Sequence, residues 1–161
     1  MKDKEKFAAY LGLFLLSAVV GSAAVFAGLN LRKKRRVRIR WRNLGGLKKL
    51  GAGEDGDVFA LVIGGILLYV GAVRADLERS VREALRRKYP DDHRVPRNIK
   101  VYVGSAVKVP ESVRQGIASL LVAMLQPPWN TPEEGIYRGN APVEVRNEGD
   151  VPPGVKSLLR L

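Results

Sequence analysis

Residues 58–73 read VFALVIGGILLYVGAV, a run of 16 uncharged residues with Gly64 and Gly65 at its centre. Branched aliphatic and aromatic residues on both sides of the glycine pair favour strands, and two adjacent glycines favour a tight turn. The run is short for a membrane helix, which needs about 20 apolar residues. We therefore expect a β-hairpin here, and a short second membrane span is the alternative.

Helix and strand patterns alternate after the hairpin. Residues 75–89 are expected to form a helix that begins at the N-cap Asp76 and stops before Pro90, because apolar residues recur in it at helical spacing. Residues 99–103, IKVYV, suit a strand, and residues 112–125 carry an apolar stripe typical of a second helix. The order hairpin, helix, strand, helix predicts an α+β domain, in which helices flank an antiparallel three-stranded sheet.

A longer apolar stretch precedes this domain. Residues 7–31, FAAYLGLFLLSAVVGSAAVFAGLNL, are 25 consecutive uncharged residues, long enough to cross a bilayer as a tilted helix. The RKKRR run at 32–36 stands where a cleaved signal peptide would release the mature chain, which favours an uncleaved anchor over a signal peptide. Small residues four apart would let two such helices approach each other, which predicts a homo-oligomer through Ser17, Gly21, Ala24 and Gly28.

Eight of the eleven residues 32–42 are Lys or Arg, and they form a basic collar after the anchor. The positive-inside bias places the N-terminus outside and the C-terminal domain in the cytoplasm or inside a virus particle. Such a cluster binds anionic lipid headgroups or nucleic-acid phosphates, and its candidates are Arg32, Lys33, Lys34, Arg35, Arg36, Arg38, Arg40 and Arg42. Val37, Ile39 and Trp41 alternate with arginines, as in an extended ribbon that lies in the membrane interface or pairs with an edge strand.

Composition divides the chain into four segments. The anchor covers 1–31, the collar and a glycine-rich linker 32–56, the α+β domain 57–130, and a tail rich in Pro, Gly and Asn 131–161. Within the tail we expect a short strand at 143–145 and an apolar patch that docks back, formed by Leu158, Leu159 and Leu161.

Charge and composition limit the function. The net charge is +12, of which residues 1–50 carry +11 and residues 51–161 carry +1, so this division assigns the charge to the collar. The chain has no Cys and one His, which excludes disulfides and thiolate zinc sites, and no metal site is expected. The abundance of Arg, Val, Leu and Pro suits a thermophile.

The predicted domain carries a series of weak motifs in order. Val58-Phe59 is followed ten residues later by Tyr69-Val70-Gly71, then by the helix pattern DLERSVREAL and by LQPPWN at 125–130. In order and spacing, these motifs resemble the GIY-YIG endonuclease domain over residues 57–130. In that family a tyrosine, an arginine and a metal-binding glutamate hydrolyse phosphodiesters. The resemblance implies that residues 57–130 have the fold of that family.

Under this resemblance several chemical groups are replaced. Phe59 stands for the first motif tyrosine, Ala118 for the metal-binding glutamate, and Ser80 for the helix arginine unless a one-residue shift lets Arg79 serve. Tyr69 and Arg79 remain the catalytic candidates, and the motif residues Gly71 and Asn130 are retained. The resemblance therefore implies the family's fold without its metal site.

Three functions compete. The first is a membrane-anchored, catalytically degenerate GIY-YIG-like module that acts in binding or assembly without a cofactor, with anionic lipid or nucleic acid at its collar. The second is a membrane-tethered endonuclease that uses Tyr69 and Arg79, with Mg²⁺ or Mn²⁺ held by Glu78, Glu111 or Asp76. The third treats 58–73 as a second span and the chain as a small membrane protein of pore or pilus type.

Overall fold

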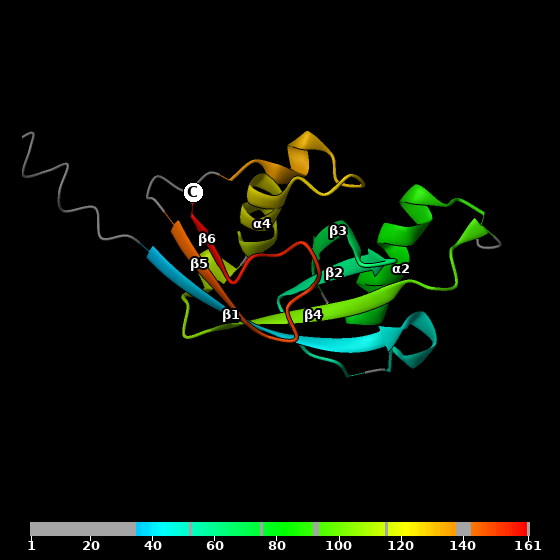
Figure 1. Ribbon diagram of the computed structural model, residues 1–161, viewed down its shortest axis with the longest axis horizontal. Coiled ribbons are helices and arrows are strands. Elements are labelled where there is room, and N and C mark those ends of the chain that lie inside the picture. Colours follow the sequence, from blue (N-terminus) through cyan, green and yellow to red (C-terminus); the bar gives the residue numbers. More distant parts are fainter. Residues whose placement is uncertain are drawn as a thin grey trace, which may run out of the picture. The chain divides into compact units, whose positions relative to one another are not determined.

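A mixed six-stranded sheet organises the chain from Arg35 onward (Figure 1). The computed structural model describes residues 35–51, 53–74, 76–91, 94–114, 116–137 and 143–160, all within one structural unit, Arg35–Leu161. The strand order is β3-β2-β4-β1-β5-β6. The strands are β1 (Arg35–Gly46), β2 (Val58–Ile63), β3 (Ile66–Ala72), β4 (Lys100–Val107), β5 (Val143–Gly149) and β6 (Leu158–Arg160). The helices are α2 (Leu77–Lys88), α3 (Glu111–Arg114) and α4 (Ile117–Leu125), with short 3-10 turns η1 (Leu47–Lys49) and η3 (Pro132–Gly135).

The predicted hairpin is confirmed, and the second-span alternative is wrong. β2 and β3 pair antiparallel, with Leu61 opposite Tyr69, and Gly64 and Gly65 form the turn between them. Both glycines have positive φ, 57° and 82°, a conformation that glycine adopts without the steric penalty of a Cβ. The apolar run therefore forms one buried strand, β2, and one partly buried edge strand, β3.

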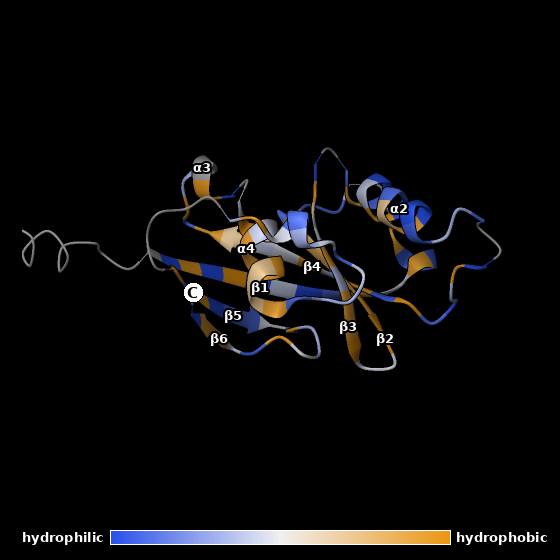
Figure 2. Cartoon of the chain, turned by 90° about the horizontal axis from the view of Figure 1, so that it is seen from above, coloured by the Kyte–Doolittle hydropathy of each residue, from blue (hydrophilic) through white to orange (hydrophobic). Residues whose placement is uncertain are grey.

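The predicted three-stranded sheet is wrong, because β1, β5 and β6 extend it on the far side of β4. β1, which includes most of the predicted collar, pairs antiparallel with β4 and parallel with β5. The side chains of Val37, Ile39 and Trp41 are only 2%, 0% and 1% exposed. Alternating apolar and arginine residues thus form a central strand whose apolar face is buried, rather than a ribbon at the surface of the domain (Figure 2).

Two helices cover parts of opposite faces of the sheet. α4 packs with Ile117, Leu120 and Leu121 into the cluster that contains Val37, Ile39 and Trp41. α2 buries Leu77, Val81 and Leu85 against the other face, on residues of β2 and β4. The predicted helix 75–89 is confirmed as α2, and its N-cap is Asp76, whose carboxylate accepts a 3.0 Å hydrogen bond from the Arg79 N–H. The predicted helix 112–125 is divided, since α3 ends at Arg114 and α4 begins at Ile117.

The predicted membrane topology is corrected. No helix within the described residues is long and apolar enough to cross a bilayer. α2 has 12 residues with many charges and α4 has 9, whereas a span needs about 20. The predicted anchor, 7–31, lies outside the described residues, with its small residues Ser17, Gly21, Ala24 and Gly28. The structure therefore gives no support to a single-pass protein with a cytoplasmic or virion-interior domain.

The C-terminal residues belong to the sheet. The short strand expected at 143–145 is the beginning of β5, which continues to Gly149. Leu159 of β6 is buried in the core, as expected for the apolar patch, whereas Leu158 is 38% exposed and Leu161 lies outside the described residues. The last strand thus covers the outer edge of β5.

A buried hydrogen bond joins β1 to β5. The Trp41 Nε1–H donates to Asn147 Oδ1 at 2.9 Å, and the Asn147 Nδ2–H donates to the Lys156 carbonyl at 2.8 Å. Gly149 lies so close to β1 that a Cβ there would meet the Trp41 carbonyl oxygen at 2.4 Å. Trp41, Asn147 and Gly149 therefore hold the two strands in register.

We expect Asn147→Ala to lower the free energy of unfolding by about 1–3 kcal/mol, because it leaves the buried Trp41 indole N–H without an acceptor. Asn98→Ala is the matched control, since Asn98 is exposed in a turn and its loss should change stability by less than about 0.5 kcal/mol. Denaturant unfolding of both variants measures the difference. Equal stability of the two variants would contradict a structural role for this bond.

Candidate functional site

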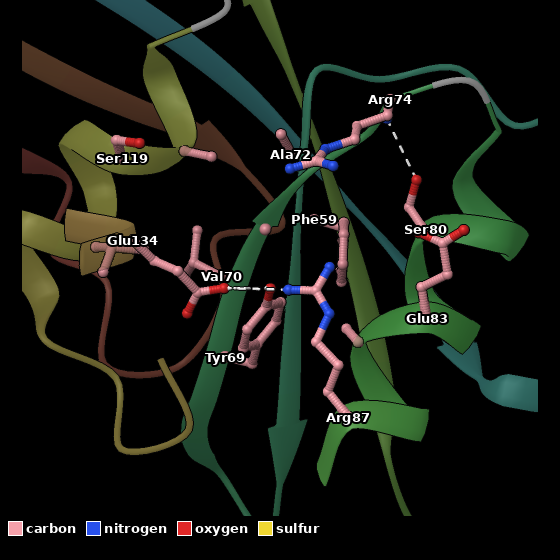
Figure 3. A pocket seen from close by; sticks show the side chains of 14 residues that line it. Phe59, Tyr69, Val70, Ala72, Arg74, Ser80, Glu83, Arg87, Ser119 and Glu134 are labelled. Atoms are coloured by element: carbon pink, nitrogen blue, oxygen red, sulfur yellow. Dashed lines mark hydrogen bonds and ion pairs between the residues drawn. The ribbon is translucent and has the colours of Figure 1, made fainter. Parts of the chain in front are cut away.

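A pocket of about 170 Å³ lies beside the edge strand β3, between α2 and α4 (Figure 3). Its walls come from β2, β3, α2, α4 and η3 and from the segment that follows β3. Apolar and small residues line part of it, including Phe59, Gly71, Ala84, Ala118 and Val122. The polar lining residues are Tyr69, Arg74, Ser80, Glu83, Arg87, Ser119 and Glu134.

Glu134 is the centre of the polar network at this pocket. Its carboxylate accepts hydrogen bonds from the Tyr69 hydroxyl at 3.1 Å, from Asn130 Nδ2 at 3.0 Å and from the Thr131 N–H at 2.9 Å. Arg87 Nη1 lies 3.6 Å from Glu134 Oε1, as an ion pair. Burial, and then the negative charge of Glu134, raise the pKa of Tyr69 to about 12. The phenol is therefore neutral near pH 7 and acts as a donor.

Sequence reasoning missed Glu134, because it looked for an acid only between Glu111 and Glu133. Glu134 belongs to η3 and returns to β3 from 65 residues further along the chain. The available signal was its position three residues after Thr131, the spacing at which a glutamate accepts from the first N–H of a helical turn. That signal predicts a cap, and it does not predict which strand the carboxylate reaches.

The pocket also contains cationic and hydroxyl groups. The side chains of Arg74 and Arg87 enter it from the segment after β3 and from α2 (Figure 3). The Ser80 hydroxyl accepts from the Arg74 N–H at 3.2 Å and donates to the Asp76 carbonyl at 2.8 Å, which ties the start of α2 to the end of β3. Guanidinium and hydroxyl groups together are suited to an anionic oxygen group such as phosphate.

Two residues that the motifs retain have structural contacts. Asn130 accepts from the Val70 N–H at 2.9 Å and donates to the Val70 carbonyl at 2.8 Å, so its amide takes the place of a neighbouring strand at the edge of β3. A Cβ at Gly71 would lie 2.8 Å from the Phe59 ring and 2.7 Å from the Tyr69 ring. Glycine is needed there because the two rings, 5.7 Å apart, pack over it.

Arg79 does not line the pocket. Its side chain is 75% exposed and pairs with Glu83 at 3.1 Å, four residues on in α2. The nuclease alternative names three metal ligands. Asp76 caps α2, and Glu78 forms an ion pair with Arg82. The side chain of Glu111 is not among those that the structure describes. The described residues contain no group of three His, Cys, Asp or Glu side chains that could hold a metal ion.

The collar arginines lie apart from this pocket. Arg36, Arg38, Arg40 and Arg42 belong to β1 and alternate with its buried residues. Arg32, Lys33 and Lys34 lie outside the described residues, as does the side chain of Arg35. From Arg35 to Leu161 the sequence holds 22 Lys and Arg against 14 Asp and Glu, a formal charge of +8. The earlier division at residue 50 separated β1 from the sheet to which it belongs, so the folded unit itself is basic.

We expect Glu134→Gln to lower the pKa of Tyr69 below about 12 while leaving it above the ordinary value of 10.0, because burial remains when the charge is removed. NMR titration of labelled tyrosines, with Tyr69→Phe for assignment, measures this shift. In the wild type, the stability that neutral Tyr69 contributes is complete below pH 10 and is lost as the pH rises toward 12. An unchanged Tyr69 pKa in Glu134→Gln would contradict the contact.

Comparison with protein-family models, with curated proteins and with solved structures finds no match for this chain. The likeness to the GIY-YIG family therefore rests on the motif residues alone, and it stays a prediction.

Proposed function

We propose that this chain is a catalytically degenerate GIY-YIG-like module that binds its partner and does not cleave it. One observation carries the proposal. Five of the residues assigned to the family's motifs line one pocket, and they come from β2, β3, α2 and α4: Phe59, Tyr69, Gly71, Ser80 and Ala118. Phe59, Tyr69 and Gly71 are neighbours in the β2-β3 hairpin, whereas Ser80 and Ala118 come from two helices that the tertiary fold brings to the same site.

At three of the positions that the motifs assign, the pocket lacks the groups that hydrolysis needs. Phe59 has no hydroxyl to orient a water molecule, Ser80 has no guanidinium for the developing charge, and Ala118 has no carboxylate for a metal ion. The carboxylate nearest to Tyr69 belongs to Glu134, which already pairs with Arg87. Binding a cation there would break contacts that tie η3 to β3 and α2.

Binding of an anionic group in this pocket does not require a metal ligand. Arg74 and Arg87 supply positive charge, and Ser119 supplies a hydroxyl group, around a space of about 170 Å³ that Glu83 and Glu134 also line. A group of phosphate size and charge fits these donors. The degenerate pocket would therefore hold an anionic group while leaving its bonds intact.

A metal-dependent phosphodiesterase is the second candidate, and one observation favours it. Glu134, Tyr69 and Arg87 bring a carboxylate, a phenol and a guanidinium into contact, which are the three kinds of group that such chemistry uses. In that case Arg87 would take the part that the motifs assign to the residue at position 80.

Incubation of the full-length chain with supercoiled plasmid and Mg²⁺ or Mn²⁺ tests the proposal. We expect no nicking above that of Glu134→Gln and Arg87→Ala, which remove the pocket's carboxylate and guanidinium. Arg86→Ala is the matched control, because Arg86 is an exposed neighbour of Arg87 in α2 that does not line this pocket. Metal-dependent nicking that persists in Arg86→Ala and disappears in the two pocket variants would establish the nuclease instead.

A further inference from the structure

Five arginines lie on one open face of the sheet. Arg36, Arg38 and Arg40 alternate in β1 with side chains buried under α4, so they point to the opposite face. Arg146 of β5 is the register partner of Arg38, and Arg160 of β6 is the partner of Glu144 on the same face. We call this set the arginine face: Arg36, Arg38, Arg40, Arg146 and Arg160.

The arginine face is exposed to solvent. The side chains of Arg36, Arg38 and Arg160 are 84%, 52% and 69% exposed. α2 packs on this side of the sheet at the cluster of Phe59 and Val103, which belong to β2 and β4. A hollow of about 420 Å³ lies over β1, β5 and the end of β4. The residues that line it include Arg36, Arg38, Lys108, Glu144 and Arg146.

The carboxylates on this face do not balance its arginines. Glu144 lies 3.8 Å from Arg36 and 3.4 Å from Arg160, and Glu148 lies 3.4 Å from Arg38. Arg40 and Arg146 have no ion pair with any residue that the structure describes. Exposed pairs of this kind contribute about 0–1 kcal/mol, so their arginines can exchange partners at little cost. Five arginines against two glutamates leave a cationic surface that folding does not require.

The arrangement of the charges indicates the class of partner. Alternate residues of a strand are about 6.6 Å apart and neighbouring strands about 4.8 Å, so the backbone positions that carry the arginines form a regular array. A polymer with evenly spaced anionic groups matches such an array, and Arg binds phosphate through two parallel hydrogen bonds. The array belongs to a unit whose formal charge is +8, which also attracts a polyanion over longer distances.

No aromatic side chain of the described strands lies on the arginine face as a platform for bases. The aromatic residues of β1 and β4, Trp41 and Tyr102, belong to the core under α4 on the opposite side of the sheet. Proteins that bind single strands stack bases on exposed aromatic side chains, and proteins that read sequence reach base edges in a groove. A face that presents arginines without aromatics is suited to the backbone of a duplex.

The geometry points to the arginine face as a binding surface for the phosphate backbone of double-stranded nucleic acid, without sequence selectivity. This inference rests on the proposed function, since it names the partner of the non-catalytic module. The surface lies on β1, β5 and β6, whereas the Tyr69 pocket lies at the β3 edge, so the two sites can be tested separately.

The test is the affinity of the full-length chain for a fluorescent 25-base-pair duplex, followed by anisotropy across a salt series without divalent metal. The key variant is Arg40→Ala with Arg146→Ala, because among the described residues these two arginines have no ion-pair partner that a substitution would release. Its matched control is Arg86→Ala with Arg97→Ala, which removes the same charge from exposed positions elsewhere. Thermal unfolding of each variant verifies that the fold is kept.

We expect the face variant to bind at least about tenfold more weakly at 0.1 M salt, with a salt slope shallower by about 1.8, because two phosphate contacts are lost. The control should stay within about threefold of the wild type, and Arg40→Lys with Arg146→Lys should retain binding because it keeps the charge. Duplexes of different sequence should bind alike.

Equal binding of the face and control variants would overturn the inference, as would a preference for single strands. A third overturning result is binding to vesicles of 30% phosphatidylserine in phosphatidylcholine that depends on Arg40 and Arg146 while duplex binding does not. Cleavage of the duplex after addition of Mg²⁺ would overturn the proposed function and leave the binding surface standing. Absence of duplex binding would leave the non-catalytic module standing without this partner.

Discussion

The burial of one side of β1 is the constraint on which the rest of the fold depends. Val37, Ile39 and Trp41 lose nearly all contact with water, and the hydrophobic effect makes this the main stabilising contribution of the strand. The Trp41 indole brings a polar N–H into the core, and Asn147 satisfies it. That bond joins β1 to β5, and β6 is added to β5. Because successive residues of a strand point to opposite faces, burial of the apolar residues necessarily displays the arginines.

The edge of β3 is closed by a different device. Asn130 pairs with both backbone groups of Val70, and Glu134 receives the Tyr69 hydroxyl, so the segment from Asn130 to η3 covers a strand edge that would otherwise be free to pair with another chain. The same contacts build one wall of the pocket. A carboxylate used to hold this wall is less available for a metal ion, which is the physical link between the closed edge and the proposed non-catalytic role.

The two sites lie at opposite ends of the strand order. The pocket depends on neutral Tyr69 and on Arg87 held by Glu134, whereas the arginine face depends on cations that fold stability does not require. Because the two sites share no residue, a substitution in one of them is not expected to alter the contacts of the other.

Local patterns determined the hairpin at 58–73, helix α2 with its Asp76 cap, and the strand character of 99–103 and 143–145, because turns, caps and periodicity depend on neighbouring residues. The alternation in β1 was visible, but its place in the sheet was not, since its partners Ala106 and Asn147 lie 67 and 108 residues from Ile39. The contact between Glu134 and Tyr69 could not be predicted for the same reason, because the two residues are 65 positions apart in the chain. Only the tertiary structure could decide which strand lies at the centre, because long-range pairing is set by burial over the whole sheet rather than by any local stretch.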